Sequence, residues 1–165
     1  MGENPSRFKG ENNPVEQVPW DDCQGFLSLL NSIPAVKDSG LTFRLPTEEE
    51  WEWACRAGAK GNYCRLADGT EISKDTLDQV AWFTRNANHK THPVGLIKPN
   101  AFGLYDMLGN VWEWTSTADG EEYVARGGSC DNTAGMCESS FPFKFRRSLR
   151  YYCLGFRLCA DSKAD

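Results

Sequence analysis

One segment constrains the fold more than any other, the stretch Asn100–Trp114, which reads NAFGLYDMLGNVWEW. It is too rich in aromatic residues and glycines for an ordinary helix or strand. Glycine turns a backbone at little steric cost, so we expect sharp turns at Gly103 and Gly109. We expect the compact, irregular scaffold so formed to bury its aromatic side chains, which are Phe102, Tyr105, Trp112 and Trp114.

Two carboxylates lie in the same segment, Asp106 and Glu113. In an irregular backbone, such side chains lie near carbonyl groups that are free from regular hydrogen bonding. Carboxylate and carbonyl oxygens together are what proteins use to bind a hard cation such as calcium. The alternative is that both side chains only accept hydrogen bonds from nearby backbone. The local chemistry favours calcium.

Length and composition indicate one globular domain. The chain has 165 residues, of which 40% are hydrophobic and 25% charged, and this length can bury a proper core. The net charge of −5 does not suit a polyanion partner. Positive charge is nevertheless concentrated between Ser139 and Ala160, where no acid occurs and where the cations are Lys144, Arg146, Arg147, Arg150 and Arg157.

Seven cysteines leave at least one unpaired. No apolar run is long enough to span a bilayer, and the first residues do not form a signal peptide. Taken as written, the chain is therefore expected in the cytoplasm, where a disulfide framework is disfavoured. Cys153 and Cys159 are read as strand residues.

Local patterns predict an α+β protein with much irregular structure. A helix is expected from Trp20, capped by an aspartate and ended by Pro34 and Gly40, and a strand over residues 41–45. Thr47 with Glu50 three residues later forms a capping box for a second helix, which stops near Gly58. Residues 58–100 are expected as a long loop held by its own aromatic side chains, and strands are expected over 123–126 and 155–159.

Several phrases in this order strongly resemble the formylglycine-generating enzyme (sulfatase-modifying factor) family. They cover nearly the whole chain, and they are Asn4–Gly10, Pro14–Glu16, Trp20–Asp22, Arg44–Glu48, Glu50–Gly58, His92–Gly95, Asn100–Trp114, Arg126–Ser129 and Gly155–Leu158. The resemblance implies a C-type-lectin-like fold, with a twisted antiparallel β core, two helices and a high content of irregular loops. The whole chain, 1–165, is then one domain that lacks the family's usual N-terminal strand and helix, as an excised piece or a natural short form.

The resemblance also bears on catalysis. In the family's oxidases, two cysteines after the Gly-Gly-Ser phrase bind copper(I), a metal that prefers soft thiolates. Here Cys137 matches the second position, but Asn132 occupies the first, and the available partner is Cys130. If the chain is an oxidase of a peptide cysteine, Cys130 and Cys137 would bind copper, with Ser129 and Trp112 lining the site. The alternative is that Cys130 is an inert buried thiol and that Cys137 neighbours Cys55 in the core.

For calcium, the resemblance agrees with the local chemistry. The family's ligands fall on the side chains of Asp106 and Glu113 and on the backbone carbonyls of Gly109 and Val111. The resemblance therefore implies a structural calcium ion at this position.

The segment from Glu138 to Leu154 combines aromatic and basic residues where lectin-like relatives face their ligands, a surface that some proteins diversify. Exposed aromatic and arginine side chains make good binding anchors. The candidates are Phe141, Phe143, Phe145, Arg146, Arg147, Arg150, Tyr151 and Tyr152. Their spacing equally fits a strand whose alternate members are buried.

The displaced cysteine pair and this segment favour a noncatalytic ligand- or protein-binding module over a copper-dependent oxidase. Its partner would be a protein, a peptide or a small molecule. A nucleic acid is disfavoured, and a membrane partner is not expected.

Overall fold

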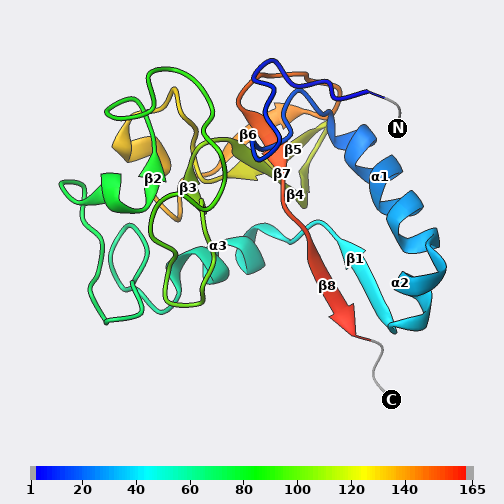
Figure 1. Cartoon of the computed structure of the whole chain (residues 1–165), viewed down its shortest axis with the longest axis horizontal. Coiled ribbons are helices and arrows are strands. Elements are labelled where there is room, and N and C mark those ends of the chain that lie inside the picture. Colours follow the sequence, from blue (N-terminus) through cyan, green and yellow to red (C-terminus); the bar gives the residue numbers. More distant parts are fainter. Residues whose placement is uncertain (1–2, 163–165) are drawn as a thin grey trace.

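The computed structural model describes residues 3–162 and has an α+β architecture rich in loops (Figure 1). Its α-helices are α1 (Trp20–Ser32), α2 (Pro34–Asp38) and α3 (Glu48–Arg56), and 3₁₀ turns span Leu77–Gln79 and Ala134–Cys137. The strands are β1 (Leu41–Arg44), β2 (Ala81–Trp82), β3 (Leu108–Gly109), β4 (Trp112–Asp119), β5 (Glu122–Arg126), β6 (Phe143–Arg146), β7 (Leu154–Phe156) and β8 (Cys159–Ser162). In the described part of the chain, no helix is long and apolar enough to cross a membrane.

The centre of the molecule is a four-stranded sheet in the order β6-β5-β4-β7. β5 pairs antiparallel with β4 and β6, as expected, whereas β7 runs parallel to β4. Two small sheets flank it, with β1 antiparallel to β8 and β2 parallel to β3. In Figure 1 the β1–β8 ribbon lies with α1 and α2 on one side of the central sheet, and β2 and β3 lie on the other.

The predicted helices form, with two differences at their ends. The capping box of Thr47 and Glu50 is confirmed at the start of α3. α1 begins instead after Pro19, which provides no side-chain cap, so the predicted aspartate cap is wrong. Asp21 and Asp22 point to arginines of a distant segment, and this competes with capping. Pro34 ends α1 and also starts the short α2, because its fixed φ suits a first helical turn.

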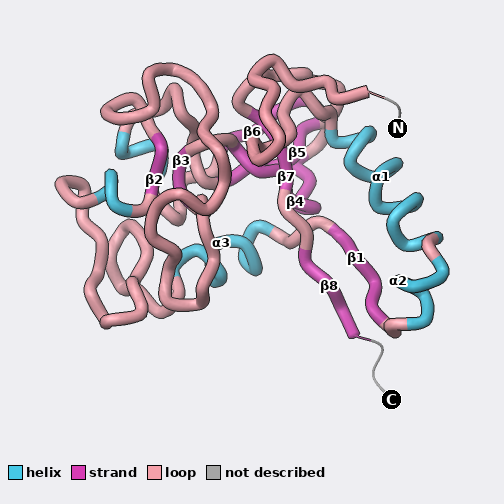
Figure 2. Tube along the Cα trace, viewed as in Figure 1, coloured by secondary structure: helices cyan, strands magenta, loops and turns pink. Residues whose placement is uncertain are grey.

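Loops make up most of the half of the molecule that contains β2 and β3 (Figure 2). Aromatic side chains hold this region, as the sequence predicted, but aliphatic side chains contribute as well, which it did not predict. Tyr63, Leu66, Ile72, Leu77 and Phe83 are all buried in one core cluster with Trp51 of α3.

A second core cluster joins the central sheet to α1. Trp112, Trp114, Ala125 and Leu154 contribute from the sheet, and Leu27 contributes from the helix. Trp112 and Trp114 are thus buried as predicted, but they belong to β4, so the end of the segment Asn100–Trp114 is a strand and not the irregular backbone expected from the sequence.

The other two aromatic residues of that segment do not follow the prediction. Phe102 is 47% exposed and Tyr105 is 43% exposed. Phe102 packs against Trp53, which is itself exposed, so this pair lies on the surface. The turns at Gly103 and Gly109 are confirmed, with φ of 78° and 74°.

Candidate functional site

The two carboxylates of the predicted calcium site lie in one pocket. Asp106, Val111 and Glu113 line a cavity of about 400 Å³ together with Gly95 and Arg157. The backbone around them is irregular, with φ of +54° at Asp106, +74° at Gly109 and +59° at Asn110. The chain therefore brings the predicted carboxylates together by turning repeatedly around β3, from Asp106 before that strand to Glu113 in β4.

Asp106 has one unsatisfied oxygen. Its Oδ2 accepts a hydrogen bond from the Gly95 amide at 2.7 Å, whereas its buried Oδ1 has no donor within the described residues. Burial raises the pKa of Asp106. A buried carboxylate oxygen without a donor is a plausible ligand for a hard cation.

Glu113 is different because it already has a cation. The Arg157 guanidinium donates to both carboxylate oxygens, at 2.6 Å and 2.7 Å, and the Trp51 indole N–H donates at 2.6 Å. A calcium ion here would share Glu113 with Arg157. The unsatisfied Asp106 oxygen is thus the one described carboxylate oxygen of this pocket that is open to a cation without competition from Arg157.

Side chains alone do not make a metal centre. Within residues 3–162, no group of three or more His, Cys, Asp and Glu side chains is arranged to hold a metal ion. Any cation at Asp106 would therefore depend on backbone carbonyls, such as those predicted for Gly109 and Val111.

Cys130 and Cys137 belong to different clusters of buried residues. The Sγ of Cys130 lies 3.3 Å from the Sγ of Cys153, which comes from the chain just before β7. Cys137 packs in the core cluster that contains Cys55, and burial raises the pKa of Cys137 to about 12. The Cys130 thiol thus contacts Cys153, and the copper site made of Cys130 and Cys137 stays a prediction. Cys55 and Cys137 belong to the same core cluster, and a direct contact between them stays a prediction.

The other two residues of the predicted oxidase site have structural contacts. Ser129 is fully buried, and its hydroxyl donates to Asn132 Oδ1 at 2.6 Å. Asn132 stands where the family's oxidases have the first copper ligand. Trp112 is buried beneath the segment that follows, and it forms the floor of an aromatic cluster.

We call this cluster the aromatic face and define it as Trp112, Phe143, Phe145, Leu149 and Tyr151. These side chains, with Asn132 and Met136, line a cavity of about 230 Å³. The rings of Phe143 and Phe145 lie 5.6 Å and 6.2 Å from Trp112. Phe141 also packs on Trp112, at 6.3 Å.

Exposure bears on both interpretations of this segment. Every residue from 141 to 152 is exposed or half-buried, and Phe143 is 39% exposed. Strand β6 is an edge strand of the central sheet, so only its β5 side is paired. Phe143 therefore lies at an open edge of the sheet, whereas Phe145 is half-buried and packs against Trp112 and Trp114, so the segment presents a partly open aromatic surface.

The basic residues of the segment have mixed roles. Arg147 donates to Asp21 and Arg150 donates to Asp22 at 2.8 Å, which ties the segment to the first turn of α1. The side chain of Arg146 has no ion-pair partner among the described residues. Arg146 is thus the arginine of the predicted set that is available to a ligand.

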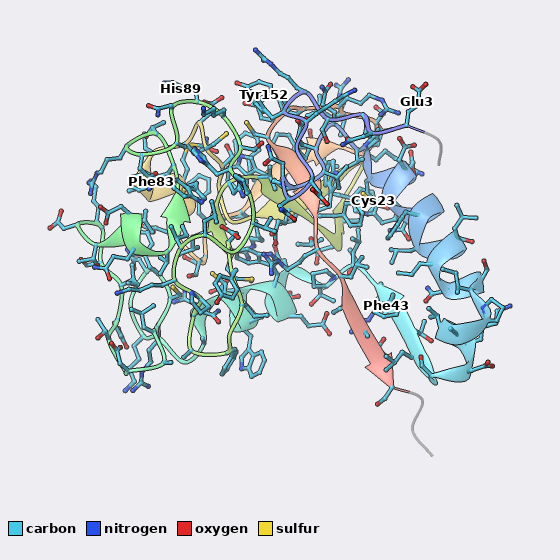
Figure 3. The ribbon with its side chains drawn as sticks, viewed as in Figure 1. Glu3, Cys23, Phe43, Phe83, His89 and Tyr152 are labelled. Atoms are coloured by element: carbon cyan, nitrogen blue, oxygen red, sulfur yellow. The ribbon has the colours of Figure 1, made fainter. Side chains whose placement is uncertain are left out.

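Tyr152 and two residues that sequence reasoning did not assign form a polar group beside the cysteine pair. Asp131 accepts from the Tyr152 hydroxyl and pairs with His89 Nδ1 at 2.7 Å. Burial raises the pKa of Asp131, but these hydrogen bonds outweigh burial and hold it below its usual range. His89 and Tyr152 lie along the same edge of the molecule in Figure 3.

Two sequence motifs locate residues of the group formed by Asp131, Tyr152 and the pair Cys130 and Cys153. Cys153 stands two residues before the phrase Gly155–Leu158, and Asp131 follows Cys130 directly. Both positions can be located from the motifs. That Cys130 would meet Cys153 depends on the parallel pairing of β7 with β4, which no local pattern indicates.

Comparisons with known proteins agree on one family. Residues 1–162 match the model of the sulfatase-modifying factor enzyme 1-like domain. The chain is 31% identical over 197 aligned positions to the chaperone protein LppX of Paenibacillus barcinonensis, covering 88% of this chain and 69% of that protein. It is 35% identical over 130 positions to the inactive C-alpha-formylglycine-generating enzyme 2 of Bos taurus, covering 73% of this chain and 40% of the bovine protein.

A solved structure shows the same fold. Variable protein 1 of Treponema denticola superposes with a TM-score of 0.83 at 30% identity, covering 97% of this chain and 78% of that structure. The mixed architecture, with few helices and a curled sheet, is accordingly the C-type-lectin-like fold that the sequence predicted. The chain therefore belongs to the sulfatase-modifying factor family, together with the formylglycine-generating enzymes.

Proposed function

We propose that this chain is a noncatalytic binding module whose ligand site is the aromatic face. The observation that carries the proposal is the half-exposed cluster of Phe143, Phe145 and Tyr151 around the 230 Å³ cavity over Trp112. Large aromatic side chains that ring a small pocket on a rigid sheet are typical anchors in protein recognition.

The proposed ligand is a protein or peptide that inserts one apolar side chain into this cavity. A cavity of this size accepts a single side chain rather than an extended small molecule. Arg147 and Arg150 are already paired with aspartates, and Arg146 follows Phe145 on β6, so its side chain leaves the opposite face of the strand and lines a different cavity with Gly120 and Glu121. A partner with one exposed apolar anchor would fit this cavity over Trp112.

Two relatives support a role without catalysis. The bovine relative is named as inactive, and the Treponema structure is named as a variable protein, which fits a scaffold whose surface changes while its core stays constant. The cysteine arrangement supports the same conclusion, because Asn132 replaces a copper ligand and Cys130 meets Cys153 instead of Cys137.

The proposal is tested by selecting peptides from a random displayed library on the purified protein. We expect selected peptides to lose at least about tenfold in affinity with Phe143→Ala or Tyr151→Ala, as binding hot spots do. The matched control is Trp53→Ala, which removes a side chain that is 69% exposed on a different surface. Peptides that respond to Trp53→Ala but not to Phe143→Ala would place the binding surface elsewhere.

A parallel assay addresses oxidation. The protein, supplied with copper(I) and oxygen, is incubated with a sulfatase-type cysteine peptide, and the product is analysed by mass spectrometry. We expect the cysteine to remain unchanged. Formation of a peptide aldehyde would overturn the noncatalytic proposal.

We propose in addition that Asp106 contributes to a structural calcium site, with the carbonyls of Gly109 and Val111 and a shared Glu113. Support comes from the buried Asp106 oxygen that lacks a donor. A ligand that binds only the native state raises the melting temperature. We expect calcium to raise the Tm relative to a chelator in the unaltered protein but not in Asp106→Asn. Equal Tm values with calcium and with chelator in the unaltered protein would exclude the site.

A further inference from the structure

Two buried thiols meet at the base of the proposed binding segment. The Sγ atoms of Cys130 and Cys153 are 3.3 Å apart, and neither residue is exposed to solvent. Among the described residues, this is the one contact between two cysteine sulfurs. A disulfide bond is about 2.05 Å long, so a small movement of the two side chains would join them.

The backbone holds both cysteines in place. The Cys130 amide donates to the Asn110 carbonyl at 2.9 Å, and the Cys153 carbonyl accepts from the Trp112 amide at 2.7 Å. Both partners belong to the same short stretch that enters β4. The positions of Cys130 and Cys153 are therefore set by a common rigid element, although the residues are 23 apart in the sequence.

The segment between the two cysteines carries the aromatic face. Residues 131–152 include Phe143, Phe145, Leu149 and Tyr151. The two ends of this segment are already in contact, because the Tyr152 hydroxyl donates a hydrogen bond to Asp131. A covalent bond between Cys130 and Cys153 would close this segment into a loop. Closing a loop restricts the unfolded chain more than the folded one.

We propose that Cys130 and Cys153 form a reversible disulfide that fixes the segment 131–152. The oxidant is a small-molecule disulfide. One cysteine thiolate attacks it and releases one small thiol, which leaves a mixed disulfide. The second cysteine thiolate then attacks the protein sulfur and releases the other small thiol. Overall, the two protein thiols lose two electrons and two protons, and one small disulfide is reduced to two thiols.

The surroundings make this exchange slow and selective. The hydrogen bond with Cys130, together with burial, raises the pKa of the Cys153 thiol, so the attacking thiolate is scarce while the pair is closed. Exchange therefore needs a local opening near Asp131 and Tyr152. The buried Cys55 and Cys137 lie in a separate core cluster from this pair and serve as internal references.

The test uses fully reduced protein equilibrated with mixtures of oxidised and reduced glutathione. Remaining thiols are alkylated, and disulfides are located by peptide mass mapping. We expect one intramolecular disulfide, between Cys130 and Cys153, which disappears in Cys130→Ala and in Cys153→Ala and persists in the matched control Cys137→Ala. Retention of all thiols, or a disulfide that maps to another pair, would overturn the proposal.

A second measurement does not depend on the variants folding. Hydrogen exchange is compared between reduced and oxidised forms of the unaltered protein. We expect slower exchange in residues 131–152 on oxidation and no change in α3, together with a Tm rise of several degrees, about the size expected for a loop of this length. Equal exchange in the two forms would show that the disulfide does not fix the segment.

The predicted effect of oxidation on ligand binding rests on the proposed function. The prediction that the disulfide forms does not. Peptides selected on the aromatic face are expected to bind the oxidised protein about tenfold more tightly, because a fixed segment loses less freedom on binding. If no peptide is selected, the mass mapping still decides whether the disulfide forms. If no disulfide forms, the Phe143→Ala comparison still decides the site of binding.

Discussion

At the scale of single residues, the centre of the molecule depends on how buried charge is balanced. Glu113 is nearly inaccessible, and its carboxylate is neutralised by Arg157, whose guanidinium also donates to the Tyr105 carbonyl at 3.0 Å. Asp106 in the same pocket has no such cation in contact and keeps an unsatisfied oxygen. Two carboxylates close together therefore behave differently, because only one has a bidentate arginine partner.

The importance of Arg157 is tested with Arg157→Met. The change keeps an apolar side chain but leaves the Glu113 charge buried without its partner, which costs about 3–5 kcal/mol in the free energy of unfolding. Urea unfolding at neutral pH measures the loss. Arg44→Met is the matched control, because the ion pairs of Arg44 with Glu50 and Asp161 are exposed and contribute at most about 1 kcal/mol. Similar losses in both variants would contradict this account of Glu113.

The raised pKa of Asp106 predicts a pH dependence of stability, measured with calcium chelated. Burial makes the native state hold the Asp106 proton more tightly than the unfolded state does. Between the ordinary value of 3.8 and the higher native pKa, the native state therefore binds more protons, and stability falls as pH rises. Asp106→Asn removes this contribution, so its stability should change less across that window. Parallel pH profiles from urea unfolding would show that Asp106 does not titrate as described.

At the scale of elements, the turn between β3 and β4 depends on a close approach that only glycine allows. Gly109 pairs with Trp82 across the β2–β3 ladder, and a Cβ there would lie 2.2 Å from the Trp82 carbonyl oxygen. The Trp82 carbonyl also accepts from the Asn110 amide at 2.7 Å. The two short strands thus position the segment that carries Asp106 and Glu113.

Two glycines allow the free-energy cost of this close approach to be measured separately from the cost of a left-handed backbone conformation. Gly40 and Gly109 have nearly the same φ, +72° and +74°, but a Cβ at Gly40 would meet nothing within 4 Å. Gly40→Ala should cost only about 1 kcal/mol for the left-handed backbone. Gly109→Ala should cost at least about 2 kcal/mol more, because backbone atoms must move apart. Equal values from thermal or urea unfolding would mean that the β2–β3 contact is looser than described.

The same elements show what sequence alone could predict. The capping box of α3 and the turns at Gly103 and Gly109 follow from local residue types, and they were predicted correctly. The sequence did not predict the exposure of Phe102 or the contact between Cys130 and Cys153. Both depend on which distant segments pack together. Likewise, Arg147 and Arg150 look like ligand contacts until the structure places Asp21 and Asp22 opposite them.

At the scale of the whole molecule, segments from both halves of the chain meet at β7. Gly155 lies beside β4 in the central sheet, and the N-terminal segment crosses directly over it at Val15. That segment is held in turn by buried Glu16, whose carboxylate accepts from the Phe8 amide at 2.7 Å. Residues near the start of the chain are thereby part of the core under the aromatic face.

Gly155→Ala tests whether this crossing holds the molecule together. A Cβ at Gly155 would lie 2.3 Å from the Val15 carbonyl oxygen, so the N-terminal segment or β7 must shift. We expect a loss of about 2–3 kcal/mol in the free energy of unfolding, with faster hydrogen exchange in residues 4–18.

The matched control is Gly25→Ala in α1, where a Cβ meets nothing within 4 Å. That change should stabilise the protein by about 0.5–1 kcal/mol, because alanine favours a helix. The same substitution should therefore act in opposite directions at the two sites. A neutral effect at Gly155 would show that the N-terminal segment moves independently of the sheet, and the aromatic face would then be carried by the central sheet and α1 alone.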